Sequence, residues 1–115
     1  ISANHGQSLE KALELIRAAK EAGADAVKFQ AYTPDSMTID SEKEPYQHSD
    51  TSLWKDLTLY RLYEKAYTPL KWFPKLFEEA RRNDIIAFSS VFDPKSIDLM
   101  EELEAPCYKI ASLEL

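Results

Sequence analysis

Two lysines stand inside short apolar runs of the sequence, where a charged side chain is unfavourable to bury. Lys28 lies between Val27 and Phe29, and Lys109 lies between a tyrosine and an isoleucine. An ammonium group in such surroundings is stabilised when it meets a negative charge. The pair therefore indicates either an anionic ligand or carboxylates on neighbouring strands. Two serine hydroxyls near predicted strand ends suit phosphate oxygens and favour the ligand: Ser90 and Ser112.

The two histidines carry a weaker signal. Asn4 and His5 follow Ile1-Ser2-Ala3, which is predicted to be the end of a strand. A loop at that place contributes to the active-site mouth of a barrel, so His5 could be a ligand, a base or a hydrogen-bond donor that tethers the loop. His48 is expected in solvent or on a substrate-contacting lid. Neither helical pair spacing nor a local Cys/His/Asp cluster is present, which is a poor metal signature.

Composition limits the class of protein. The chain has 115 residues, of which 44% are hydrophobic and 30% charged, as expected for one folded domain. The balance of 14 basic and 20 acidic residues gives a net charge of −6 without a basic segment, which argues against nucleic acid as a partner. No apolar run approaches the roughly 20 residues of a membrane span. Cys107 is predicted to be a buried, inert thiol, which fits the cytoplasm.

Hydrophobic periodicity predicts alternating helices and strands. Helices are expected between Ser8 and Gly23, over 59–66, after Thr68-Pro69, and from Asp93-Pro94 to about 103. Strands are expected over 26–32, 85–90 and 107–111. The segment 35–57 has no sustained period and is interpreted as a lid.

The order of elements predicts an α/β fold with a parallel sheet and right-handed crossovers. An open doubly wound sheet and a barrel both satisfy it. In the first complete strand, Lys28 and Gln30 share one face, while Val27 and Phe29 share the face expected to pack under helices. Polar residues inside apolar strands favour the barrel, whose strands turn one face inward. The chain is expected to be truncated at both ends, because it starts at Ile1 without methionine and finishes on a strand-like run.

Four segments resemble, in order and spacing, the N-terminal barrel of the sialic acid synthase family, over essentially the whole chain. They are Ser2-Ala3-Asn4-His5, the run 22–30 ending in Lys28-Phe29-Gln30, Phe88-Ser89-Ser90-Val91-Phe92-Asp93 and Lys109-Ile110-Ala111-Ser112. Within the family, 2–5, 32–35 and 59–69 are most similar to its pseudaminic acid branch. The family's Ser-Thr-Pro-Phe pattern is here Ser89-Ser90-Val91-Phe92, and loss of the proline leaves that loop less constrained.

The resemblance implies about the first four β/α units of a (β/α)8 TIM barrel. It also implies a metal-dependent condensation of phosphoenolpyruvate with an N-acetylated amino sugar, giving a nine-carbon acid and phosphate. By motif, phosphoenolpyruvate would be held by Lys28, Ser90, Lys109 and Ser112, and the sugar would meet Gln30, Asn4 and His5. The divalent metal, Mn or Mg, would have its ligands outside this chain, and the full-length protein would be a homodimer.

Two other interpretations stay open. Lys28 or Lys109 could be the nucleophile of a Schiff-base aldolase, because desolvated strand lysines suit that chemistry. A noncatalytic fragment or binding module would keep the sheet without turnover. The sequence does not identify the amino sugar.

Overall fold

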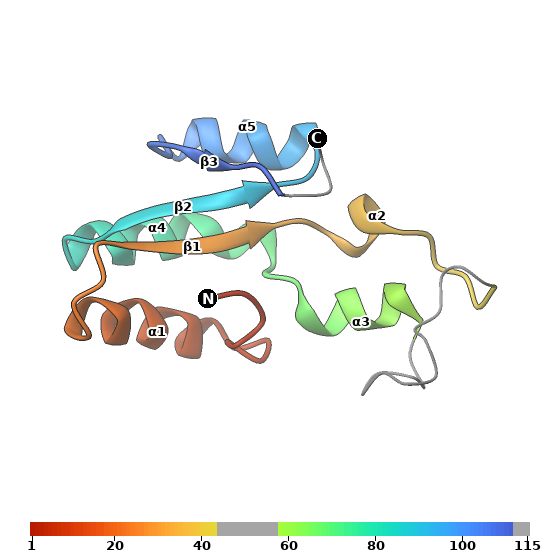
Figure 1. The fold of residues 1–115 in the computed structure, drawn as a ribbon, viewed down its shortest axis with the longest axis horizontal. Coiled ribbons are helices and arrows are strands. Elements are labelled where there is room, and N and C mark those ends of the chain that lie inside the picture. The colour runs from red at the N-terminus through yellow and green to blue at the C-terminus, as the bar shows by residue number, and fades with distance from the viewer. Residues whose placement is uncertain (44–57, 112–115) are drawn as a thin grey trace.

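The computed structural model describes residues 1–43 and 58–111, which form a parallel three-stranded sheet and its connecting helices (Figure 1). In chain order the elements are α1 (Leu9–Glu21), β1 (Ala26–Ala31), α2 (Pro34–Met37), α3 (Leu59–Ala66), the 3-10 helix η1 (Leu70–Trp72), α4 (Phe73–Arg82), β2 (Ile86–Val91), α5 (Pro94–Glu102) and β3 (Tyr108–Lys109). The prediction of an α/β fold with a parallel sheet is confirmed.

The sheet follows the chain, in the order β1-β2-β3. Each pair of neighbouring strands is parallel, with helices on the connection between them. All carboxyl ends of the strands therefore meet at one edge of the sheet. In Figure 1 the arrows of β1 and β2 point the same way, and α2 and α3 lie beyond their tips.

One face of the sheet is covered by helices, and we call it the covered face. Val27 and Phe29 point to this face and are 5% and 1% exposed. The Phe29 ring meets Phe73 of α4 edge-to-face at 5.9 Å between centroids and Phe77 at 6.5 Å. Apolar residues recur along α4 at helical spacing, which gives it the stripe that this face buries. Others in the same core are Ala12, Ile16, Leu76, Ala80, Ala87 and Met100.

Capping residues set the helix ends as predicted. The Ser8 hydroxyl accepts a hydrogen bond from the Lys11 backbone N–H at 3.2 Å, and Gly23 follows the helix with φ +87°. At α5 the Asp93 carboxylate accepts from the Ser96 N–H at 2.8 Å, and the Ser96 hydroxyl accepts from the Asp93 N–H at 3.1 Å. These capping contacts fix where α1 begins and ends next to β1 and where α5 begins after β2.

Several predicted elements are corrected. Ile1 to Ala3 form a turn rather than a strand end, because Ser2 has φ +51° and redirects the chain. The loop predicted from residue 35 begins instead with α2, whose capping box uses Thr33; residues 44–57, including His48, lie outside the described residues. Thr68 does not cap a helix, because its hydroxyl bonds His5 and η1 begins after Pro69 without a side-chain cap.

The last predicted strand is also shorter than expected. Only Tyr108 and Lys109 pair with β2, and their neighbour Ile110 is 60% exposed. Cys107 is exposed, so the prediction of a buried thiol is wrong. Cys107 and Ile110 flank the two paired residues and lie outside the ladder with β2. Ala111 is the last described residue, and Ser112 lies beyond it.

Candidate functional site

Polar side chains form a row across the uncovered side of the sheet, which we call the open face. Gln30 of β1 is paired in register with Ser90 of β2, and Ser90 with Lys109 of β3. Paired residues of neighbouring strands point to the same side, opposite to Phe29 and its covered face. The structure therefore brings together three of the predicted site residues, one from each strand.

Lys28 lies on the same open face, two residues before Gln30. It is exposed, whereas the sequence led us to expect a half-buried ammonium; the helices cover only the other side of β1. Lys109 is partly buried, and Ser90, flanked by both outer strands, is 3% exposed. Lys28 is paired with Phe88 and Lys109 with Ser90. Neighbouring strands are about 4.8 Å apart and each residue rises about 3.3 Å, so the Cα atoms of the two lysines are separated by about 12 Å. One anion between the two ammonium groups would lie over β2 between Phe88 and Ser90.

Neither lysine is neutralised by a nearby acid in the described part of the chain. The ion pairs found there, with nitrogen and oxygen no more than 4.0 Å apart, use Arg17, Lys20, Arg61 and Arg82 instead. These four cations belong to helices. The open face consequently carries two positive charges without a carboxylate partner among residues 1–43 and 58–111, which favours the anionic ligand over carboxylates on neighbouring strands.

The loop before α1 reaches the polar row. The Ser2 hydroxyl donates a hydrogen bond to Gln30 Oε1 at 2.8 Å, and the Ile1 amino group donates to the Lys28 carbonyl at 2.9 Å. Burial, and secondarily the charge of Lys28, lowers the pKa of this amino group. Asn4 is exposed in the same loop. Ser2 belongs to the motif Ser2-Ala3-Asn4-His5, but the sequence does not predict it as a site residue.

His5 has a different environment from the one predicted for a sugar contact. Its side chain is 0% exposed, and its Nε2 lies 2.9 Å from the Thr68 hydroxyl oxygen. The Gln7 N–H donates to Nδ1 at 3.1 Å, which makes Nδ1 the acceptor and Nε2 the protonated donor. The ring also meets Trp72 edge-to-face at 5.5 Å. Both nitrogens are engaged within the protein, which favours the tethering role over contact with a sugar.

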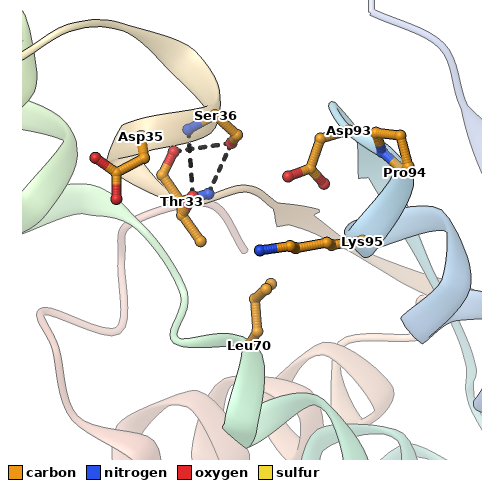
Figure 2. Close-up of a pocket in the computed structure, with 7 residues that line it drawn as sticks. All are labelled: Thr33, Asp35, Ser36, Leu70, Asp93, Pro94 and Lys95. Carbon is orange, nitrogen blue, oxygen red and sulfur yellow. Dashed lines mark hydrogen bonds between the residues drawn. The ribbon is translucent and has the colours of Figure 1, made fainter.

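A cavity of about 550 Å³ lies beside the carboxyl ends of β1 and β2 (Figure 2). Figure 2 shows Lys95 extended across it toward Thr33, above Leu70, with the Asp93 carboxylate nearby. None of the predicted site residues lines it; the lining is Thr33, Asp35, Ser36, Leu70, Asp93, Pro94 and Lys95. The signal was available, because both Thr33-Pro34 and Asp93-Pro94 follow strands whose ends meet at one edge.

Aromatic side chains pack together between the carboxyl ends of β1 and β2 and helix α3. Tyr32, 6% exposed, meets Tyr63 edge-to-face at 5.6 Å and Phe92 at 5.7 Å. Burial raises the pKa of Tyr32 to about 12, with a smaller contribution from Tyr63. Its hydroxyl therefore stays protonated near neutral pH and cannot serve there as a base. The Tyr60 hydroxyl donates to Asp35 at 3.0 Å and joins α3 to α2.

The described residues do not fit a metal ion. Across 1–43 and 58–111, no three His, Cys, Asp or Glu side chains converge, and both nitrogens of His5 are already bonded. A metal-dependent step therefore cannot be derived from these side chains. In the same residues no helix is long and apolar enough to cross a membrane.

Comparison with known proteins agrees with this α/β sheet. The family model described as "NeuB family" matches residues 15–115. A pseudaminic acid synthase of Helicobacter pylori (strain ATCC 700392 / 26695) is 50% identical over 115 residues, covering 100% of this chain and 34% of that protein. A pseudaminic acid synthase of Campylobacter jejuni subsp. jejuni serotype O:23/36 (strain 81-176) is 48% identical, covering 99% of this chain and 33% of that protein.

Solved structures give the same result. The crystal structure of N-acetylneuraminic acid (sialic acid) synthetase from Leptospira borgpetersenii serovar Hardjo-bovis, in complex with citrate, superposes with a TM-score of 0.74 at 28% identity, covering 97% of this chain and 34% of that one. The chain spans about a third of the length of the curated relatives it matches. The resemblance to sialic acid synthases, and to their pseudaminic acid branch, is confirmed, and the chain belongs to the NeuB family.

Proposed function

We propose that this chain is part of a synthase that condenses phosphoenolpyruvate with an N-acetylated amino sugar. Joining three carbons to a six-carbon sugar gives a nine-carbon acid, and water must replace the phosphate that leaves. The observation that carries the proposal is the row Gln30, Ser90 and Lys109, with Lys28 beside it, on the open face of a NeuB-family sheet. We infer that the sheet is the first part of a (β/α)8 barrel whose interior is this open face.

The side chains of the row suit the two substrates. Phosphoenolpyruvate bears a carboxylate and a phosphate, and two ammonium groups on side chains whose Cα atoms are about 12 Å apart can meet one group each. Ser90 between them offers a hydroxyl donor, and Ser112 is proposed as a further one. Preorganised positive charge of this kind stabilises the charge that develops as phosphate departs. Gln30 and the exposed Asn4 can both donate to and accept from sugar hydroxyls.

The carbonyl of the open-chain sugar still has to be activated. We propose that a divalent metal, Mn or Mg, does this from ligands outside the described residues, since those residues do not fit one. Pseudaminic acid is the favoured product, because the pseudaminic acid synthases named above are 48% to 50% identical to the chain. Homodimer formation and a cytoplasmic location are further expectations of this proposal.

The experiment that tests the function uses the full-length protein that contains this segment. Phosphate release is measured with phosphoenolpyruvate and a panel of mono- and di-N-acetylated six-carbon sugars, with each substrate omitted in turn. Release that requires both substrates, together with a nine-carbon acid detected by mass spectrometry, supports the synthase. The 115-residue chain alone is expected to be inactive. Covalent trapping of pyruvate on Lys28 or Lys109 by borohydride would support a Schiff-base aldolase instead.

A further inference from the structure

The amide of Gln30 is oriented by a residue that belongs to no predicted site. The Ser2 hydroxyl donates to Gln30 Oε1 at 2.8 Å. A serine hydroxyl can donate to the oxygen of a glutamine amide or accept from its nitrogen, so this contact holds the amide group in one place whichever of its ends meets Ser2. No other hydrogen bond of the Gln30 side chain occurs among the described residues. The end of the amide that does not meet Ser2 can therefore bond a ligand.

Ser2 reaches Gln30 with its backbone in a conformation that is uncommon for residues other than glycine. Its φ is +51°, a left-handed conformation that is unfavourable for a residue with a Cβ, and Gln7 in the same loop has φ +60°. Two successive turns form the loop. The Asn4 N–H donates to the Ile1 carbonyl at 3.2 Å, and the Gly6 N–H donates to the Ala3 carbonyl at 3.0 Å. Strained residues persist where surrounding contacts over-determine them.

Those contacts are supplied by the connection between α3 and η1. His5, 0% exposed, bonds the 2% exposed Thr68, and the pair is buried together against Trp72. The Gln7 side-chain Nε2 donates to the Tyr67 carbonyl at 2.5 Å. Loop 1–7 is therefore attached to the protein at one end by a buried pair and at the other by β1. Its position relative to Gln30 is fixed by packing and not by chain connectivity alone.

We propose that Ser2 is a positioning residue that holds the amide of Gln30 where it can hydrogen-bond the sugar, and that the His5–Thr68 pair holds Ser2 in place. The inference rests on the proposed synthase function. It predicts a role in sugar recognition and none in binding of phosphoenolpyruvate, because Ser2 contacts Gln30 and neither lysine ammonium. The sequence predicts Asn4 and His5, and not Ser2, as the residues of this loop that contact the sugar.

The kinetic test compares Ser2→Ala with Ser2→Gly in the full-length protein. Both remove the hydroxyl, but glycine also relieves the left-handed backbone. Each variant is expected to raise the KM for the sugar by about 2- to 12-fold, the equivalent of one neutral hydrogen bond, with the KM for phosphoenolpyruvate unchanged. In a Gln30→Ala background, Ser2→Ala should have no further effect. Equal losses for both substrates, or additive losses in the double variant, would overturn the proposal.

A spectroscopic arm separates this inference from the function on which it rests. With glutamine side chains labelled by nitrogen-15, the Gln30 amide signal is assigned by its loss in Gln30→Ala. Ser2→Ala should shift or broaden that signal while leaving other glutamine signals and the melting temperature in place. An unchanged Gln30 signal would contradict the positioning role even in an active enzyme. A wild-type protein that releases no phosphate, yet shows the Ser2-dependent signal, would reject the synthase and retain the positioning contact.

Discussion

The covered face and the open face of the sheet carry different kinds of side chain. On the covered face, Val27 and Phe29 are 5% and 1% exposed, and the Phe29 ring contacts the rings of Phe73 and Phe77 in α4. On the open face, one residue away along β1, Lys28 is exposed and Gln30 is partly buried. The period of two along a strand places these opposite chemistries next to each other in sequence.

Packing and binding are therefore separated within a single six-residue strand. Apolar burial on one side fixes the position of β1, and this fixes where Lys28 and Gln30 stand on the other. Residues of the covered face should therefore govern stability, and residues of the open face should govern ligand affinity. The following predictions, for the full-length protein that contains this segment, test that separation.

The largest effect is expected for Phe29→Ala. The ring is 1% exposed and contacts two phenylalanines of α4, so its removal leaves a cavity in the core. The free energy of unfolding should fall by about 3 to 5 kcal/mol. Chemical denaturation monitored by circular dichroism measures this loss. Phe29→Leu is the matched control, with a smaller cavity and a smaller loss; equal losses for both variants would argue against packing as the cause.

Most of the covered face could be predicted from sequence because its signals are local. The spacing of Phe73, Leu76 and Phe77 identifies the buried stripe of α4, and Ser8 and Asp93 identify helix starts. The predictions failed where the conformation of a residue depends on a partner that is distant in the sequence. A threonine before a proline is a good cap, yet the hydroxyl of Thr68 bonds His5, which is 63 residues away.

The second effect is expected for the open face, where Lys28→Met or Lys109→Met should weaken binding of phosphoenolpyruvate. Each substitution keeps most of the apolar stem and removes one charge. Loss of a charge-assisted hydrogen bond would cost about 1.5 to 3 kcal/mol, or roughly 10- to 150-fold in affinity. Titration calorimetry measures it, and Lys95→Met, outside the polar row, is the control. Unaltered affinity combined with a large loss of unfolding free energy would return both lysines to a structural role.

The candidate site could be predicted only in part. Alternation along β1 placed Lys28 and Gln30 on one face, but the pairing of Gln30 with Ser90 and of Ser90 with Lys109 depends on strand register. Register follows from how whole strands pack, which no local pattern encodes. The role of Ser2 was missed for the same reason, since its contact with Gln30 spans 28 residues.

The smallest effect is a pH dependence at His5, in the buried pair that attaches the loop to the core. Burial, and secondarily the charge of the Ile1 amino group, lowers the pKa of His5 below its ordinary 6.5. In a longer chain, the Ile1 nitrogen would be an amide without that charge, whereas burial would persist. The native imidazole is neutral, and a second proton would have to displace the Gln7 N–H from Nδ1.

The sign of the effect follows from proton linkage. Below pH 6.5 the unfolded state binds a proton that the native state resists, so the free energy of unfolding should decline as the pH falls from 6.5 toward the native pKa. The slope cannot exceed about 1.4 kcal/mol per pH unit for one proton. Denaturation midpoints of wild type and His5→Gln, compared from pH 7.5 to 5, measure it. Glutamine can keep a donor toward Thr68 but does not titrate, so subtraction of its curve removes contributions from other groups. A difference that is flat with pH would mean that folding leaves the pKa of His5 unchanged, and a free energy of unfolding that rises as the pH falls would mean that the native loop holds the protonated imidazole; either result would contradict the neutral, tethering imidazole.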